Sequence, residues 1–215
     1  DPHGAERDER IAVINAQITR ITRLMNDTLE MIELNEGVIN YEFELLDLSQ
    51  LVRTVVTDFE ARAQESQHTL TLAISPERIE IQADERLIRL ALKHIVGNAI
   101  SYTPEGGKIT VSLLRSGDRV YINVEDTGMG IAPEDQPHIF EPHYRADKAR
   151  SLSGGAGLGL SISQKIIEGH HGDIRLTSVL DHGTTVCLEL PCMQPPPVLI
   201  PPQVAMSGAW SPSPH

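Results

Sequence analysis

The first 36 residues carry a long helical pattern that cannot bury its own apolar side. From about Glu6 to Glu36, apolar residues recur in steps of three and four, which places them along one seam of a helix. The seam consists of Ile11, Ile14, Ile18, Ile21, Met25, Thr28 and Ile32, and it is widened by Leu24, Leu29, Met31 and Leu34. This width favours a four-helix bundle over a two-stranded coiled coil. We therefore expect partner helices, with packing against the rest of the chain as the alternative, and Gly37 as the C-terminal stop.

Strand and helix patterns then alternate through the middle of the chain. Alternating apolar residues predict strands, and longer amphipathic runs predict helices. The expected extended segments are Tyr41–Leu46, His68–Ser75, Ile79–Gln82, Lys108–Arg115, Arg119–Glu125, Asp173–Ser178 and Thr184–Leu190, and the expected helices run from Asp47–Ser49 to about Ser66, over Glu85–Tyr102 and over Leu158–Glu168. Asp84 is a candidate N-cap for the second helix, and Ser116 to Asp118 form a hairpin signal.

Composition limits the class of protein. With 215 residues, 40% of them hydrophobic, the chain is long enough for one well-buried domain and an appendage. The formal net charge of −12 and the lack of a basic stripe argue against nucleic-acid binding. Cys187 and Cys192 do not form a disulfide or metal pattern, and neither a membrane span nor a signal peptide is visible, so we expect a reducing, cytoplasmic compartment. Eight of the 14 prolines lie from Pro191 onward, which predicts a disordered tail.

Three separate segments contain residues suited to one class of ligand. In HIVGNAISYT (His94 to Thr103), Asn98 places an amide on a mostly apolar helix, where an oxygen could bind a hard Mg²⁺ ion. In VEDTGMGI (Val124 to Ile131), Asp126 ends a strand and could accept a hydrogen bond from an exocyclic amine such as that of adenine. Taken alone, Asn98 could equally be a surface or capping residue, and the D-x-G-x-G pattern from Asp126 could equally be a strand that ends in a turn.

The third segment, SGGAGLGLSIS (Ser153 to Ser163), is a glycine loop that opens a helix. Backbone N–H groups and the positive helix end suit a polyphosphate. The segment is not a Rossmann loop, because no strand leads into it, and it lacks the Gly-Lys-Ser/Thr ending of a P-loop.

The order of these segments, with IFEPHYR (Ile139 to Arg145) between the second and third, resembles the N, G1, F and G2 boxes of sensor histidine kinases. These kinases belong to the wider ATPase group of gyrase, Hsp90 and MutL. The resemblance implies an α+β fold of the Bergerat type, a two-layer sandwich with helices on one face of a mixed sheet, preceded by one long bundle-forming helix. Three regions follow: residues 1–37 as the second helix of a dimerisation hairpin, 38–191 as the ATP-binding catalytic domain, and 192–215 as the tail.

The resemblance also implies an ATP and Mg²⁺ site. Asn98 would hold the metal, Tyr102 would lie against the adenine, Asp126 would read its amino group, Phe140 would anchor a mobile lid over about His143–Ala156, and Thr185 would border the adenine end. The complete set of implied ATP-binding residues is Asn98, Ser101, Tyr102, Asp126, Gly128, Gly130, Ile131, Tyr144, Arg145, Lys148, Gly155, Ala156, Gly157, Leu158, Gly159, Leu160 and Thr185.

The sequence departs from the family pattern in three places. His94 stands where the family has the first Asn of the N box, and it could be a core histidine or a phosphate-side donor. Ser101 stands where the family usually has a Lys. Arg145, Lys148 or Arg150 could offset the loss of that positive charge. None of the nine histidines is followed by Asp or Glu, so the expected phosphoacceptor His is absent. The sequence therefore predicts a phosphoryl-transfer module that acts on a histidine of a separate helix hairpin.

The resemblance implies a homodimer in the full-length kinase, which could be membrane-anchored, and a response regulator as partner. Two alternatives stay open. One is an anti-sigma-type serine kinase of the same ATPase group, although such kinases generally lack the preceding hairpin. The other is a non-catalytic dimerisation or regulatory module, which His94 and Ser101 favour. A gyrase- or MutL-type ATPase fits less well, because the expected lid is short.

Overall fold

The computed structural model describes residues 2–35, 40–75, 78–146 and 156–193. Gly37, Lys148, Gly155, most of the expected lid and the tail from residue 194 lie outside these ranges. None of the described helices is both long and apolar enough to cross a lipid bilayer.

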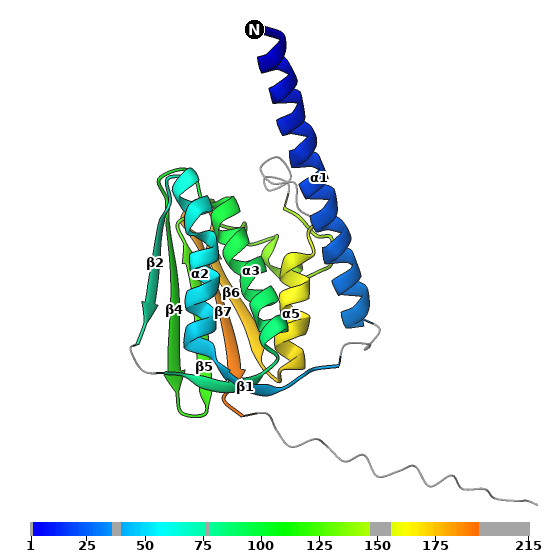
Figure 1. The fold of residues 1–215 in the computed structure, drawn as a ribbon. Coiled ribbons are helices and arrows are strands. Elements are labelled where there is room, and N and C mark those ends of the chain that lie inside the picture. Colours follow the sequence, from blue (N-terminus) through cyan, green and yellow to red (C-terminus); the bar gives the residue numbers. More distant parts are fainter. Residues whose placement is uncertain (1, 36–39, 76–77, 147–155, 194–215) are drawn as a thin grey trace, which may run out of the picture.

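The N-terminal helix α1 runs from Pro2 to Asn35, close to the bounds that its apolar pattern predicted. Figure 1 shows its N-terminal half projecting beyond the rest of the molecule, while its C-terminal part packs beside α5 (Gly159–Gly169). On that part, Met31 is 5% exposed and belongs to the hydrophobic core. Among the side chains of this helix that the structure describes, the exposed large apolar ones are Ile11, Ile14, Ile18, Ile21, Met25, Leu29 and Ile32. One side of α1 therefore packs on the domain, and most of the apolar seam faces solvent.

The remaining elements form two layers (Figure 1). Helices α2 (Leu48–Glu65), α3 (Glu85–Tyr102) and α5 cover one face of a five-stranded sheet. The strands are β2 (Thr69–Ile74), β4 (Lys108–Ser116), β5 (Arg119–Asp126), β6 (Asp173–Val179) and β7 (Gly183–Pro191), in the order β2-β4-β5-β7-β6. β2 runs parallel to β4, and the other pairs are antiparallel. The expected sandwich with a mixed sheet is confirmed.

Two short strands form a second sheet that the strand patterns did not predict as a pair. β1 (Glu44–Asp47) pairs antiparallel with β3 (Glu80–Ala83), and a short 3₁₀ helix, η1, covers Gln136–His138. The far end of the domain also differs from expectation. Cys192 is 6% exposed, and its backbone bonds with Asp118 and Gln82, so the packed domain includes this residue.

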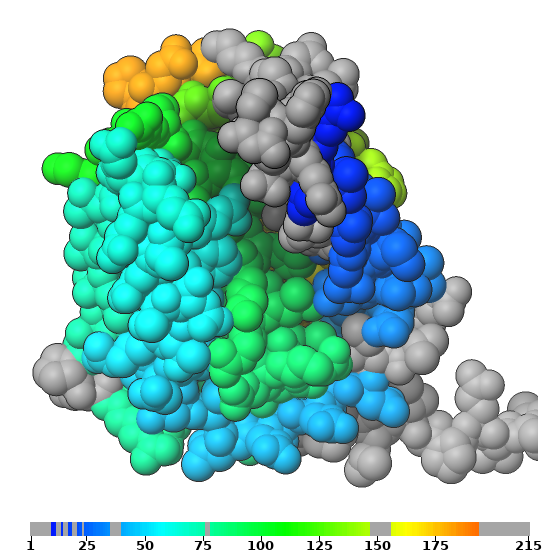
Figure 2. All heavy atoms as spheres, turned by 45° about the horizontal axis from the view of Figure 1, so that its top comes forward, coloured from blue at the N-terminus to red at the C-terminus, as the bar shows by residue number. Residues whose placement is uncertain are grey.

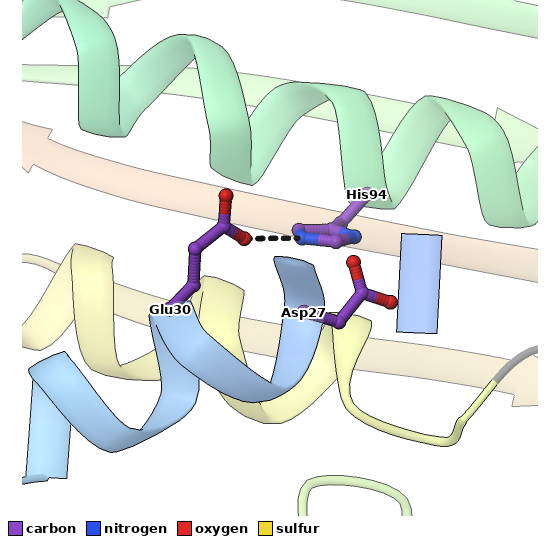
Figure 3. A group of neighbouring side chains, drawn as sticks. All are labelled: Asp27, Glu30 and His94. Atoms are coloured by element: carbon purple, nitrogen blue, oxygen red, sulfur yellow. Dashed lines mark ion pairs between the residues drawn. The ribbon is translucent and has the colours of Figure 1, made fainter. Parts of the chain in front are cut away.

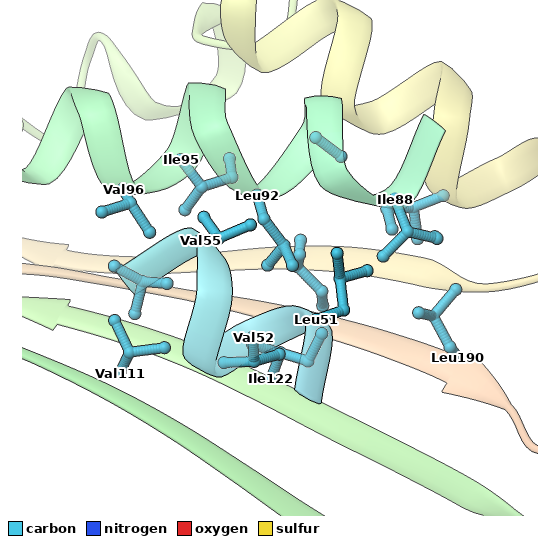
Figure 4. Packing of buried hydrophobic residues seen from close by; sticks show 14 of the residues in the cluster. Leu51, Val52, Val55, Ile88, Leu92, Ile95, Val96, Val111, Ile122 and Leu190 are labelled. Atoms are coloured by element: carbon cyan, nitrogen blue, oxygen red, sulfur yellow. The ribbon is translucent and has the colours of Figure 1, made fainter. Parts of the chain in front are cut away.

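The hydrophobic core lies between the helices and the sheet. Figure 4 shows side chains of α2 and α3 packed against side chains of the strands. The helix residues are Leu51, Val52, Val55, Ile88, Leu92, Ile95 and Val96, and the strand residues are Val111, Ile122 and Leu190. The expected N-cap of α3 is confirmed, because Asp84 Oδ1 accepts from Leu87 N (3.1 Å), and Asp47 caps α2 in the same way, with its Oδ1 accepting from Gln50 N (2.9 Å). These caps fix where α2 and α3 begin, and the apolar stripes of both helices fix which side faces the sheet.

His170, which follows α5, is a buried structural histidine. The Asp84 backbone N–H donates to its Nε2 (3.0 Å), and its Nδ1 lies 2.7 Å from the Ile166 carbonyl oxygen. Because an N–H group can only donate and a carbonyl can only accept, the ring must be neutral, with its proton on Nδ1. Burial lowers the pKa of His170; the Ile166 carbonyl and the Asp84 carboxylate oppose this effect, and His171 adds to it.

This geometry predicts a loss of stability in mild acid. Above the pKa of an unfolded histidine, about 6.5, the ring is neutral in both states and adds no pH dependence. As the pH falls below that value, the unfolded chain takes up the proton first, so the free energy of unfolding should decrease. We expect His170→Gln to reduce this slope in urea titrations between pH 7.5 and 5. Exposed His182→Gln is the matched control, and an equal slope in wild type and H170Q would contradict the assignment.

Candidate functional site

Several of the sequence-predicted site residues lie where three elements end or begin. Asn98 lies near the C-terminal end of α3, Asp126 ends β5, and Gly157 and Leu158 lead into α5. Figure 2 shows α3 between α2 and α1, at the bottom of a hollow in the surface. The helix packing and the sheet register therefore bring residues from distant parts of the sequence to one end of the sandwich.

Asp126 is held in place by two backbone hydrogen bonds. It follows Val120, Ile122 and Val124 on the side of β5 that is buried against the helices. Its Oδ1 accepts from the backbone N–H groups of Gly128 (2.8 Å) and Thr184 (3.2 Å). No described residue hydrogen-bonds to its Oδ2. The carboxylate is thus held in place by one oxygen, and the other is available to a ligand.

The electrostatics of Asp126 also set it apart. Burial raises the pKa of this carboxyl group above its usual value, and nearby Glu125 acts in the same direction. The two backbone N–H donors lower the pKa and offset only part of that effect. A partly buried carboxylate that gives up solvation in this way gains more from a ligand donor than an exposed one does.

The glycine turn after Asp126 is clamped between α3 and β6. A Cβ on Gly128 would lie 2.5 Å from the Tyr102 carbonyl oxygen, and a Cβ on Gly130 would lie 2.0 Å from the Val179 carbonyl oxygen. The turn is fastened by hydrogen bonds from Met129 N to Tyr102 O (3.1 Å) and from Ile131 N to Ser178 Oγ (2.8 Å). Backbone therefore passes close to backbone on both sides, as expected for the wall of a narrow site.

On α3, Asn98 and Ser101 have different surroundings. Asn98 is half-buried, and its side chain makes no hydrogen bond to a described residue. Ser101 Oγ accepts from Arg62 Nη2 (2.9 Å) of α2 and donates to Gly97 O (2.7 Å). Arg62 thus brings a guanidinium to the position where the family pattern has a lysine. Arg62 was not among the predicted site residues, because an exposed arginine on another helix gives no local signal in the sequence.

The glycine segment before α5 follows the end of the expected lid. Gly157 has a φ of +72°, and its carbonyl accepts from His143 N (3.0 Å), which ties the two ends of the lid together. Leu158 is 1% exposed and occupies the N-cap position of α5. Ala156 and Leu160 pack against the core, and a Cβ on Gly159 would lie 3.0 Å from His94 Nδ1. The residues from Ala156 to Leu160 therefore anchor the start of α5.

The remaining predicted residues lie at the edges of the site. Tyr144 donates from its hydroxyl to Asp135 Oδ1 (2.6 Å), and Arg145 is half-buried beside it. Thr185 pairs with Glu125 in the β5–β7 ladder and lies on the opposite face of the sheet from Asp126. Its neighbour Thr184 pairs with Asp126 and contacts that carboxylate through its backbone N–H. The structure therefore brings Thr184, and not Thr185, to Asp126.

The side chain of Asn98 fits a hard cation such as Mg²⁺ whose other ligands are water and phosphate oxygens. Asn98 is half-buried on α3, four residues after His94, which lies beside Gly159, and its amide oxygen makes no hydrogen bond to a described residue. Mg²⁺ keeps several waters and binds substrate phosphates, so one protein oxygen is a plausible contribution. Mg²⁺ at this place would depend on a phosphate ligand.

Known proteins with the same fold support this description. Residues 83–194 match the family of histidine kinase-, DNA gyrase B-, and HSP90-like ATPases. The sensor histidine kinase WalK of Bacillus subtilis is 32% identical over 185 residues, which cover 84% of this chain and 30% of that protein. The catalytic domain of the histidine kinase ThkA shares 31% identity at a TM-score of 0.64 and covers 71% of this chain and 97% of that domain.

Two larger structures extend the likeness. ShkA, solved as a full-length protein in complex with AMPPNP, shares 28% identity at a TM-score of 0.76, over 88% of this chain and 40% of that one. ThkA in complex with the response regulator protein TrrA shares 27% identity at a TM-score of 0.68, and the match covers 86% of this chain and 51% of that one. This chain spans between 30% and 46% of the length of the first curated relatives. It belongs to the histidine kinase-, DNA gyrase B-, and HSP90-like ATPase family, and its fold is that of the catalytic domain of sensor histidine kinases.

Proposed function

We propose that this chain is the ATP- and Mg²⁺-binding catalytic module of a sensor histidine kinase, which positions the γ-phosphate for transfer to a histidine outside this sequence. The observation that carries the proposal is the Asp126 carboxylate, partly buried and held through one oxygen by Gly128 and Thr184. Its other oxygen would accept from the adenine amino group. The glycine turn that follows would wall the base.

The other residues would act mainly by positioning. Asn98 would bind Mg²⁺, which supplies charge neutralisation at the phosphates when it is bound. Arg62, hydrogen-bonded to Ser101, and Arg145 would add positive charge near the phosphates. Gly157 and Leu158 would present backbone N–H groups to the phosphates at the start of α5. Lys148 and Gly155, which lie outside the described residues, would also contact the nucleotide.

The partners follow from the same proposal. ThkA has been solved in complex with the response regulator protein TrrA. For this chain, a response regulator would be the final acceptor of the phosphoryl group. The phosphoacceptor hairpin would come from the same kinase or from a partner kinase. The exposed apolar seam of α1 would pack in a homodimeric bundle of the full-length kinase, on the cytoplasmic side of a membrane if that kinase is anchored.

Calorimetric titration of the chain with AMPPNP, with and without Mg²⁺, tests the proposal. We expect saturable binding that strengthens when Mg²⁺ is present, because the cation joins Asn98 to the phosphates. In Asn98→Ala, the affinity without Mg²⁺ should stay near wild type, and the gain from Mg²⁺ should fall by about tenfold, from the loss of roughly 1.5 kcal/mol of interaction with a charged group.

A matched control variant and two contrary outcomes sharpen this experiment. Asn123→Ala removes an amide from β5, where its Nδ2 contacts Ser112 and not the site, so its Mg²⁺ response should equal that of wild type. Retained Mg²⁺ dependence in N98A would assign the metal to another residue. No binding of AMPPNP at millimolar concentration would overturn the catalytic proposal and favour a non-catalytic module.

A further inference from the structure

A second group of chemically active side chains lies outside the proposed nucleotide site, between α1 and α3. Asp27 and Glu30 lie almost one turn apart on α1, and His94 faces them from α3 (Figure 3). One ligand atom from each residue lies within 4.8 Å of those of the other two. The packing of the two helices, and not closeness in sequence, brings these residues together.

Two atoms of this cluster are buried without a hydrogen bond. Glu30 Oε2 and His94 Nε2 are both shielded from solvent, and neither has a hydrogen-bond partner in the part of the chain that the structure describes. They face each other at 3.9 Å, too far apart for a hydrogen bond. Asp27 beside them is only 7% exposed. Buried polar atoms are seldom left unsatisfied, since this costs roughly 1–3 kcal/mol for each group, so the gap between them calls for an occupant.

We propose that Asp27, Glu30 and His94 bind a divalent transition-metal cation, with Zn²⁺ as the best match. One imidazole nitrogen and two carboxylate oxygens form a donor set typical of zinc, with water as the fourth ligand. At bond lengths of about 2.0–2.2 Å, a tetrahedral zinc ion holds its ligand atoms roughly 3.3–3.6 Å apart, so small side-chain rotations close the 3.9 Å gap. The charge of the ion also neutralises both carboxylates.

This cation differs in place and chemistry from the Mg²⁺ of the proposed nucleotide site. Its nitrogen ligand suits zinc, whereas Mg²⁺ prefers oxygen ligands and its own waters. His94 precedes Asn98 by one helical turn, and its other ring nitrogen, Nδ1, lies beside Gly159 at the start of α5. A bound cation therefore joins the position of α1 to the segment that opens α5. It fixes the hairpin helix on the catalytic domain next to the nucleotide site.

The experiment is a titration of the whole chain with Zn²⁺ in the absence of nucleotide, in a chelator-competition assay, repeated with Co²⁺ to record the absorption of a tetrahedral site. We expect one tight site and visible Co²⁺ bands. His94→Asn, which introduces the residue of the family pattern, and Glu30→Gln should each weaken this site by at least about tenfold. Glu33→Gln on the exposed side of α1 and His182→Gln are matched controls that should bind as wild type.

A second readout separates this site from the proposed function. AMPPNP binding with Mg²⁺ should persist in Glu30→Gln, which shows that the variant is folded and that only the cation site is lost. Asn98→Ala should keep the Zn²⁺ site. If wild type shows no tight Zn²⁺ or Co²⁺ binding, or if H94N and E30Q bind these ions as wild type does, the cluster is an ion pair only and the proposal is overturned.

Discussion

Asp126→Asn is expected to lower the affinity for AMPPNP by about 10- to 150-fold, which corresponds to the roughly 1.5–3 kcal/mol of a hydrogen bond to a charged acceptor. The fold should survive, because the asparagine oxygen can accept from Gly128 and Thr184 as Oδ1 does now. The amide nitrogen then replaces Oδ2 and presents a donor to the adenine amino group. The expected loss of affinity therefore comes from two hydrogen-bond donors, the asparagine amide and the adenine amino group, that face each other. It does not come from a change in the backbone turn.

Inosine nucleotides make this prediction selective. Hypoxanthine carries a carbonyl oxygen where adenine carries the amino group, so it should bind wild type poorly and bind D126N better. Calorimetric titrations with the adenosine and inosine triphosphates should thus show a reversed or strongly reduced preference in the variant. Glu125→Gln, on the opposite face of β5, is the matched control for a change of charge. An unchanged preference in D126N would remove Asp126 from base recognition.

Most of the fold could be predicted because local patterns and packing agree. The Asp84 cap and the apolar stripe of α3 predicted a helix from Glu85 to Tyr102, and these are its bounds in the structure. The alternation in β4 and β5, with a short polar turn, predicted their hairpin. In each case neighbouring residues carry the information, so a single sequence is sufficient.

The features that could not be predicted depend on residues far apart in the chain. The pairing of β1 with β3, the contact of Arg62 with Ser101 and the meeting of Glu30 with His94 follow from how whole helices and strands dock. His94 shows the difference clearly. The sequence left it as a core histidine or a phosphate-side donor, and neither reading included a helix from the other end of the chain.

Register explains why Thr184, and not the predicted site residue Thr185, lies beside Asp126. The two residues are neighbours in one strand, so they point to opposite faces of the sheet. Which of them faces the site depends on how β7 aligns with β5, where Asp126 pairs with Thr184. The segment GTTVCLELP contains both threonines, and its alternation identifies a strand without showing which face meets Asp126.

Gly130→Ala is expected to destabilise the protein by about 2–5 kcal/mol and to weaken AMPPNP binding, because two penalties add at this position. Gly130 has a φ of +63°, which costs an L-residue roughly 1–2 kcal/mol. A Cβ there would also lie 2.0 Å from the Val179 carbonyl oxygen and 2.9 Å from Leu180 Cα. Both are backbone atoms that cannot rotate away, and overpacking of this kind costs about 1–3 kcal/mol. The turn that walls the base must therefore move.

Gly117→Ala separates the two penalties. Gly117 has the same φ of +63°, in the turn between β4 and β5, but a Cβ there meets nothing within 4 Å. This variant should lose only the conformational cost and should bind AMPPNP as wild type does. Urea denaturation gives the difference in the free energy of unfolding, and titration gives the difference in affinity. Equal destabilisation in both variants, with unchanged binding, would mean that the turn moves aside without cost and that its close contact with β6 does not shape the nucleotide site.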